Sequence, residues 1–228
     1  MPKTALLTGI SGFIGLHCAK ELLKCGFKVR GTIRNPNKKK VVCDSLKLNE
    51  EEAKRIEFFL LDLTSDHGWE VAMRDCTFVM HVASPFKIAN PKNANDFFKP
   101  AIEGTERVLR HAQHAGVRRV ILTSSIVSMM SNLKTGQFSP NDWTDLSRRN
   151  LSTYIKSKTL SERLAWDFVN KEEKTNQNKQ RMLELAVIAP GGVFGPPLGK
   201  DFSAESLYVM TKMLRENATC SGYCYSNG

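Results

Sequence analysis

The stretch TALLTGISGFIG, residues 4–15, constrains the fold of this chain more than any other feature. Its glycines Gly9, Gly12 and Gly15 stand three residues apart behind a short apolar run, and apolar positions at helical spacing follow them. A glycine-rich turn between a strand and a helix lets the backbone approach a pyrophosphate, and the helix N-terminus adds free N–H groups and a partial positive charge. We therefore expect a nucleotide-binding turn here. The alternative is a tight turn without a ligand.

Apolar runs alternate with longer segments of helical periodicity along the rest of the chain. This alternation favours an α/β fold with a doubly wound parallel sheet of the Rossmann type. We expect residues 1–200 to form a nucleotide-binding domain and residues 201–228 to begin a substrate-binding segment that is cut short, because no strand follows the last helical stretch. The expected strands are 4–8, 28–33, 56–61, 77–82, 119–124 and 183–188, and the expected helices are 13–25, 95–114, 154–171 and 203–216.

The composition is that of a globular protein with one large core: 41% of the 228 residues are hydrophobic and 25% are charged. No apolar run is long enough to span a membrane, and the first residues lack the regions of a secretory signal, so we expect a cytoplasmic protein without a membrane partner. The six cysteines are scattered, which predicts no disulfide framework. Cys220 and Cys224 form a close pair without a second pair, so we expect no metal site.

The positive charge of the chain is concentrated near the glycine turn. The net charge is +10, and residues 1–50 contain ten lysines and arginines against three acidic residues. A nucleic-acid reader would also carry a recognisable module or basic residues interleaved with aromatic ones, and neither pattern is present. The charge therefore favours a small phosphorylated ligand over nucleic acid.

Six motifs follow one another along the chain: TGISGFIG at 8–15, DL at 62–63, HVASP at 81–85, TSS at 123–125, YIKSK at 154–158 and PGGVFGP at 190–196. Together they resemble the extended short-chain dehydrogenase/reductase family from residue 3 to about residue 215, and within it the dihydroflavonol 4-reductase-like branch of ketone and aldehyde reductases. The resemblance implies a Rossmann fold and a dinucleotide cofactor. The cofactor-binding residues that it implies are Gly9, Ser11, Gly12, Phe13, Ile14, Gly15, Arg34, Lys40, Asp62, Leu63, Val82, Ala83, Ser84, Thr123, Tyr154, Lys158, Pro190, Gly192 and Val193.

The residues after the second expected strand predict which dinucleotide binds. NAD-specific sites place an acidic residue about twenty positions beyond the glycines, where it accepts hydrogen bonds from the ribose 2′-OH. This chain has Arg34 there and no acidic residue before Asp44, with the lysines 38–40 nearby. A guanidinium suits a 2′-phosphate, so we expect NADPH or NADP⁺. A solvated basic loop is the alternative. The resemblance places Asp62 and Leu63 beside adenine, although a carboxylate after a strand is often a cap.

Tyr154 and Lys158 are the candidate catalytic pair. Four residues apart in a helical segment, they lie on one face, and a nearby ammonium is expected to lower the pKa of the tyrosine and make it a useful proton donor. The alternative is an ordinary surface pair on an amphipathic helix. The resemblance makes Ser125 the serine that hydrogen-bonds the substrate carbonyl, with Ser124 and Ser128 as alternatives.

Two positions depart from the family pattern. Many relatives carry an asparagine three places before a glycine–threonine pair, and this chain has Ala101, so a water-linked proton relay through that side chain is absent. Dihydroflavonol reductases carry an asparagine where this chain has Met130, which weakens a flavonoid assignment and predicts an apolar pocket near Phe86, Met129 and Met130. Ordinary core packing is the alternative for these three side chains.

The leading hypothesis is an NADPH-dependent oxidoreductase that reduces a small-molecule aldehyde, ketone or dihydroflavonol-like carbonyl to an alcohol. A nucleotide-sugar epimerase or dehydratase of the same family is the enzymatic alternative, although such enzymes usually use NAD. A non-catalytic NADP(H)-binding sensor or scaffold is the alternative from another class. We expect the short final segment to leave part of the substrate cleft open, with weak turnover as the result. The oligomeric state stays open.

Overall fold

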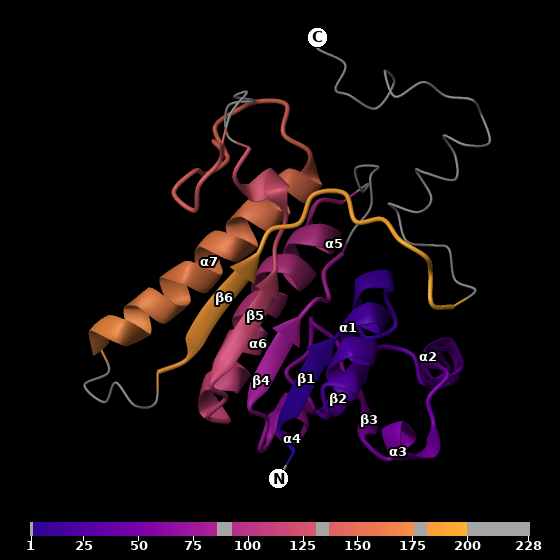
Figure 1. The fold of residues 1–228 in the computed structure, drawn as a ribbon. Coiled ribbons are helices and arrows are strands. Elements are labelled where there is room, and N and C mark those ends of the chain that lie inside the picture. The colour runs from indigo at the N-terminus through magenta and orange to yellow at the C-terminus, as the bar shows by residue number, and fades with distance from the viewer. Residues whose placement is uncertain (1, 86–92, 131–136, 176–181, 200–228) are drawn as a thin grey trace, which may run out of the picture.

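The computed structural model describes residues 2–85, 93–130, 137–175 and 182–199. Its centre is a sheet of six parallel strands in the order β3-β2-β1-β4-β5-β6 (Figure 1). The expected doubly wound α/β fold is confirmed, and each expected strand is present to within one residue at either end. The strands are β1 (Thr4–Thr8), β2 (Lys28–Ile33), β3 (Ile56–Leu60), β4 (Phe78–His81), β5 (Arg119–Thr123) and β6 (Glu184–Ile188).

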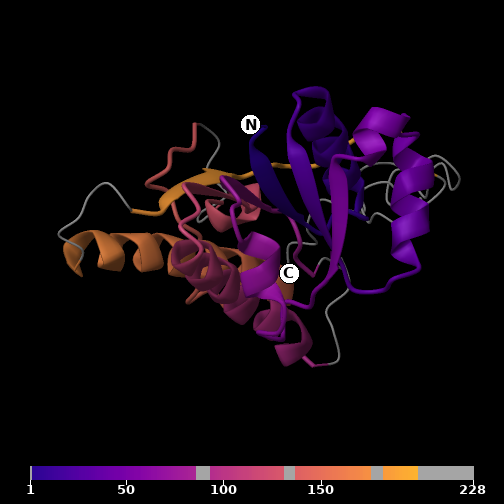
Figure 2. The ribbon, with the colours of Figure 1, turned by 90° about the horizontal axis from the view of Figure 1, so that it is seen from below.

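Helices cover both faces of this sheet because alternate strand residues point to opposite sides. Leu7 belongs to a core cluster with the helices α1 and α2, whereas its neighbour Leu6 belongs to a second cluster with α4, α6 and α7. Figure 2 shows α1 on one side of the sheet and α6 and α7 on the other. The helices are α1 (Phe13–Lys24), α2 (Lys38–Leu46), α3 (Glu50–Ala53), α4 (Trp69–Met73), α5 (Asn95–Phe98), α6 (Gly104–His114) and α7 (Thr153–Thr175).

The expected helix 95–114 is divided into three parts. Between α5 and α6 lies a π-helical segment, η1 (Lys99–Glu103). Pro100 has no N–H to donate to the carbonyl four residues earlier, and its ring crowds that carbonyl, so the backbone widens there. The short helices α2, α3 and α4 were not expected, and the expected helix 203–216 lies outside the described residues.

The strand order changes direction at β1 and β4, whose ends Thr8 and His81 are paired in register. In an open α/β sheet, a ligand binds outside the carboxyl ends of the strands at this switch point. Two glycines of the turn after β1 are required by the geometry. Gly9 has φ +68° and lies against Ala83, and a Cβ on Gly15 would overlap the Gly9 carbonyl oxygen.

We predict that Gly15→Ala destabilises the fold by about 1–3 kcal/mol, because the backbone of the turn has to move to admit the methyl group. Gly12→Ala is the matched control: a Cβ there meets only the Gly9 carbonyl oxygen at 3.4 Å, and the φ of Gly12 is −81°. Urea denaturation measures both variants. Equal free energies of unfolding for the two variants would contradict the steric role of Gly15.

Candidate active site

A cavity of about 1420 Å³ lies at the carboxyl edge of the sheet. It is bordered by the glycine turn, the ends of β2, β3, β4 and β5, the segment after β6 and the first turns of α7. Every residue predicted from the sequence to bind cofactor or catalyse lines this cavity, with the exception of Lys40. These lining residues are Gly9, Ser11, Gly12, Phe13, Ile14, Gly15, Arg34, Asp62, Leu63, Val82, Ala83, Ser84, Thr123, Ser125, Tyr154, Lys158, Pro190, Gly192 and Val193.

The glycine turn presents the N-terminus of α1 to the cavity. The helix begins after Gly12 and has no acidic side chain in its first turn, so the partial positive charge of its N-terminus is not offset there. The turn is held by hydrogen bonds from the Gly12 amide to the Gly9 carbonyl, 3.0 Å, and from the Gly9 amide to the Thr32 hydroxyl, 3.2 Å. This end of the cavity is suited to an anionic group.

Arg34 and Lys40 are placed differently. Arg34 follows β2, is exposed, and lines the cavity beside Asp62. Lys40 lies in the first turn of α2, where its ammonium pairs with Asp44 at 3.0 Å, and it does not border the cavity. The lysines 38–40 were expected near Arg34, with a solvated basic loop as the alternative. They are part of a helix instead, and Lys39 lies over the Phe58 ring and borders a second, smaller cavity.

Asp62 borders the cavity after β3, and its carboxylate also caps its own turn. Its Oδ1 accepts hydrogen bonds from the hydroxyl and the amide of Thr64, at 2.6 and 2.7 Å, and these bonds are the main cause of the lowered pKa of Asp62. The buried Trp69 side chain donates its Nε1–H toward the carbonyls of Ser65 and Asp62, at 2.8 and 3.3 Å. Asp62 thus stabilises a turn by its side chain, not a helix end as in the alternative considered for it, and it still borders the cavity.

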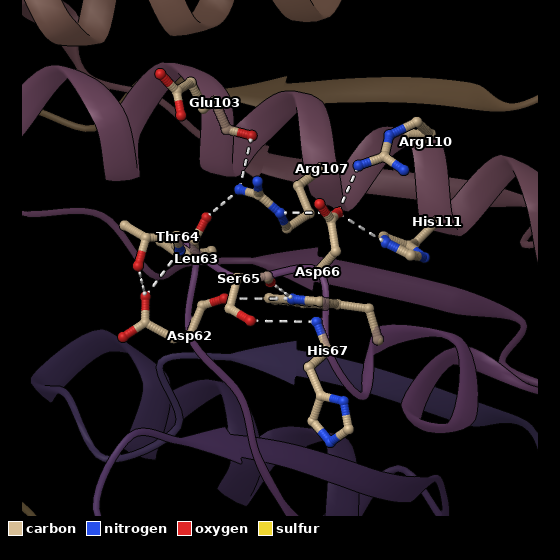
Figure 3. A network of polar contacts seen from close by, with 11 residues as sticks. Asp62, Leu63, Thr64, Ser65, Asp66, His67, Glu103, Arg107, Arg110 and His111 are labelled. Carbon is tan, nitrogen blue, oxygen red and sulfur yellow. Dashed lines mark hydrogen bonds and ion pairs between the residues drawn. The ribbon is translucent and has the colours of Figure 1, made fainter.

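A charge cluster anchors this turn to α6 (Figure 3). The Oδ1 atom of Asp66 accepts from Arg107 at 3.0 Å and from Arg110 at 2.5 Å, and lies 3.3 Å from His111 Nε2. Arg107 also donates to the carbonyl of Leu63, a cavity residue. Hydrogen bonds from the two arginines lower the pKa of Asp66 to about 2. The cluster was not predicted from the sequence, because its members are about forty residues apart.

The candidate catalytic residues meet where β5 and α7 approach the cavity. Tyr154 and Lys158 lie on successive turns of α7, and Ser125 follows β5. The Lys158 ammonium donates to the Thr123 carbonyl at 2.9 Å, and the hydroxyls of Ser125 and Tyr154 are hydrogen-bonded to each other.

The expected low pKa of Tyr154 is not found in this structure. Burial raises the pKa of Tyr154, and the hydrogen bond with Ser125 opposes that rise only in part. Burial also lowers the pKa of Lys158, to about 8. The spacing of the two residues correctly placed them on one face. The ammonium is directed to a backbone carbonyl, however, and the loss of hydration is the largest influence on the pKa of the phenol.

Glu162 binds the hydroxyls of two of the three candidate serines. This buried carboxylate, which the sequence reasoning missed, accepts hydrogen bonds from Ser124 and, at 2.6 Å, from Ser128. The Ser125 hydroxyl has only long contacts of its own, 3.4 Å from the Val127 amide and 3.5 Å from the Pro190 carbonyl, besides its bond with Tyr154. Of the three candidate serines, Ser125 is thus the one whose hydroxyl is not bonded to this carboxylate.

His81, at the end of β4, joins the end of β1 to α6. The Thr8 hydroxyl accepts from the amides of Val82 and Ala83, at 3.0 Å each, so its proton is directed to His81 Nδ1 at 2.9 Å. The Nε2–H of the ring is then directed to the Thr105 hydroxyl at 3.4 Å. Burial, with Lys158 nearby, lowers the pKa of His81 to about 3, so the ring is neutral at physiological pH.

Two other predictions involve residues that lie outside the described segments. Met129 and Met130 are half-buried, whereas Phe86 lies outside the described residues, so the predicted apolar pocket is described only in part. Cys220 and Cys224 also lie outside them, and the four described cysteines are free thiols. In the part of the chain that the structure describes, no helix is both long and apolar enough to cross a bilayer.

We predict that Asp66→Asn lowers Tm at neutral pH, because Arg107 and Arg110 lose their carboxylate partner. The folded pKa of about 2 lies below the unfolded value, so this stabilisation is present above about pH 4 and is lost as the pH falls toward 2. The Tm difference between parent and variant should therefore shrink over that range. Asp44→Asn, which removes a single exposed partner of Lys40, is the control and should change Tm little. A pH-independent difference for Asp66→Asn would contradict the assignment.

The relatives of this chain include plant reductases. An anthocyanidin reductase of Vitis vinifera, the (2S)-flavan-3-ol-forming one, is 34% identical over 208 residues, which cover 87% of this chain and 58% of that protein. A dihydroflavonol 4-reductase of Zea mays is 34% identical over 205 residues, which cover 85% of this chain and 53% of that protein. The chain thus spans less than two thirds of the length of these relatives.

A solved structure has a fold similar to that of this chain. The crystal structure of yeast methylglyoxal/isovaleraldehyde reductase Gre2, complexed with NADPH, superposes with a TM-score of 0.77 at 24% identity, over 93% of this chain and 66% of that one. The model of the NAD dependent epimerase/dehydratase family matches residues 5–221. The resemblance to extended short-chain dehydrogenases/reductases is confirmed, and the chain belongs to the NAD dependent epimerase/dehydratase family.

Proposed function

We propose that this chain is the cofactor-binding and catalytic part of an NADPH-dependent oxidoreductase that reduces a small-molecule carbonyl to an alcohol. The observation that carries the proposal is the convergence of Ser125, Tyr154 and Lys158 on the same cavity as the glycine turn and Arg34. In this proposal residues 1–200 hold the cofactor and residues 201–228 begin the segment that contacts substrate. Free thiols at the four described cysteines support a reducing compartment such as the cytoplasm.

The cavity residues fit NADPH in shape and charge. The close backbone approach at Gly9 and Gly15 and the uncompensated N-terminus of α1 suit a pyrophosphate. Arg34 borders the same cavity, where its guanidinium would bind a 2′-phosphate, and Asp62 and Leu63 would border adenine. The volume of about 1420 Å³ exceeds that of a typical drug-sized site and leaves room for a substrate beside the nicotinamide.

NADPH supplies a hydride when it is bound, and the residues of the chain supply the rest of the chemistry. The Ser125 hydroxyl hydrogen-bonds the carbonyl oxygen of the substrate and stabilises the negative charge that develops on it. Tyr154, which the raised pKa keeps protonated at neutral pH, donates its phenolic proton to that oxygen. Lys158 places a positive charge beside the resulting phenolate, and the protonated oxygen becomes the alcohol hydroxyl.

The relatives support a reductase over the other members of this family. The grape and maize proteins are named reductases, and the yeast structure contains NADPH. The epimerase or dehydratase alternative would require the hydride to return to the product, usually with NAD, and the presence of Arg34 at the ribose position disfavours NAD. A non-catalytic NADP(H)-binding protein would not need Ser125, Tyr154 and Lys158 to meet at the cavity.

We predict that NADPH binds more tightly than NADH by about 1.5–3 kcal/mol and that Arg34→Ala removes most of this difference, because one charge-assisted phosphate contact is lost. Titration calorimetry with NADPH and with NADH measures the two dissociation constants for the parent chain and for the variant. Arg74→Ala, a change of the same type at an exposed position outside the cavity, should leave the preference intact. Equal dissociation constants of the parent chain for NADPH and NADH would disprove the cofactor assignment.

We predict that Tyr154→Phe slows the chemical step by about a hundredfold or more while NADPH affinity changes little, because only the proton donor is lost. Lys158→Ala should lower both the rate of the chemical step and the affinity for NADPH, since Lys158 also borders the cofactor cavity. Single-turnover oxidation of bound NADPH by a panel of aldehydes, ketones and dihydroflavonols measures the rate. Parent-like single turnovers in Tyr154→Phe would exclude this residue as the acid.

A further inference from the structure

Glu162 is a buried acid that the proposed chemistry does not use. It lies on α7 one turn beyond Lys158, and only 6% of its surface is exposed. A buried carboxylate is costly unless hydrogen bonds and an opposite charge compensate it, so its retention here calls for a physical reason. The two serine hydroxyls that bind its Oε2 atom and the ammonium of Lys158 provide the compensation.

The hydrogen bonds of Glu162 reach the turn that carries Ser125. Its partner Ser128 lies in the short 3₁₀ segment η2 (Ile126–Ser128), which begins directly after Ser125. The Ser128 hydroxyl lies 2.6 Å from Glu162 and 2.8 Å from the Ser125 carbonyl oxygen, and it shares its proton between them. Ser124, on the other side of Ser125, also donates to Glu162. The segments on both sides of the substrate-binding serine are therefore attached to one carboxylate.

Glu162 and Lys158 together attach α7 to the end of β5. Lys158 binds the Thr123 carbonyl at 2.9 Å, and Glu162 binds the hydroxyl of the next residue, Ser124. Two successive turns of one helix thus hold two successive residues of the strand. Residues four apart on a helix face the same side, so the two opposite charges also act on each other within a largely dehydrated region.

We propose that Glu162 is a positioning residue with two tasks: it fixes the turn that orients Ser125, and it is the buried counter-charge that keeps Lys158 cationic. The first task rests on the proposed function, whereas the second concerns the folded chain alone. Among the described residues, His81, Tyr154 and Thr123 also lie near Lys158, and none of them supplies a negative charge. His81 on β4 is neutral, Tyr154 is protonated, and β5 contributes the Thr123 carbonyl. Burial lowers the pKa of Lys158, and Glu162 is the group that opposes this effect.

The decisive experiment measures Lys158 directly. In the parent chain and in Glu162→Gln, lysines labelled with ¹³C at Cε are titrated by NMR, and Lys158→Arg identifies the signal. The pKa of Lys158 should fall by about one pH unit or more in Glu162→Gln. Glu184→Gln, the same change in a glutamate of β6 that pairs with Arg119, is the matched control and should leave the titration unchanged. An unchanged Lys158 titration in Glu162→Gln overturns the counter-charge task whether or not the chain turns over substrate.

A second measurement separates the two tasks. With NADPH and a carbonyl substrate, Glu162→Gln should lower kcat about tenfold, leave the NADPH dissociation constant within about twofold, and move the alkaline limb of the rate profile to lower pH. Ser128→Ala should lower kcat without moving that limb, because it loosens the serine turn and keeps the carboxylate. Parent-like kcat in both variants overturns the orienting task. Absent turnover in the parent chain would refute the proposed function instead. The orienting task would then be decided by comparing the position of the Ser125 side chain, determined by NMR or by crosslinking, between the parent chain and Glu162→Gln.

Glu162→Asp covers the case in which the glutamine variant does not fold. This variant keeps the negative charge. Its side chain is shorter by one methylene, so the carboxylate lies farther from the two serine hydroxyls. Lys158 should then titrate as in the parent chain, while kcat falls as it does in Ser128→Ala. A reduced pKa of Lys158 in Glu162→Asp with parent-like kcat would contradict both tasks.

Discussion

The carboxyl edge of the sheet depends on how closely three segments of backbone approach one another after β1. Gly9 lies against Ala83 from the end of β4, and Gly15 of α1 lies against the carbonyl of Gly9. These contacts leave no space for a Cβ, so the first turn of α1 can begin directly over the switch point of the sheet. The Thr8 hydroxyl, which binds the amides of Val82 and Ala83, holds β4 in the same place. The cavity takes its shape from this arrangement.

The ionisable groups near the cavity differ in which neighbouring groups stabilise their charge state. His81 is buried and neutral between two threonines, whereas Lys158 is buried beside a carboxylate one helical turn away. Asp66 is held by cations at the surface, outside the cavity, where water weakens each interaction. Dehydration is therefore the main influence on the pKa values of His81 and Lys158. The cluster around Asp66 instead holds the Asp62–Leu63 turn in place, because Arg107 donates to the Leu63 carbonyl.

The strands and the glycine turn could be predicted because their signals are local. Apolar runs such as 119–123 are covered on both faces, and three glycines between a strand and an amphipathic helix are typical of a nucleotide-binding turn. The helix at 38–46 was not predicted, because its basic run hides the apolar side chains, such as Val42 and Leu46, that pack it on the core. The pKa of Tyr154 could not be predicted from spacing, because burial depends on the whole fold. Glu162 gave no signal, since a glutamate on a helix is usually solvated.

The π-helical segment η1 has a consequence for the way one stretch of chain performs two tasks. An extra residue in a helical turn rotates every following side chain by about 100° relative to an uninterrupted helix. Before this segment, Asn95, Asp96 and Phe97 border the cavity; after it, Val108, Leu109 and Ala112 pack into the core beneath the sheet. The same stretch of chain therefore borders the cavity at one end and packs into the protein interior at the other, with the widened turn at Pro100 between the two parts.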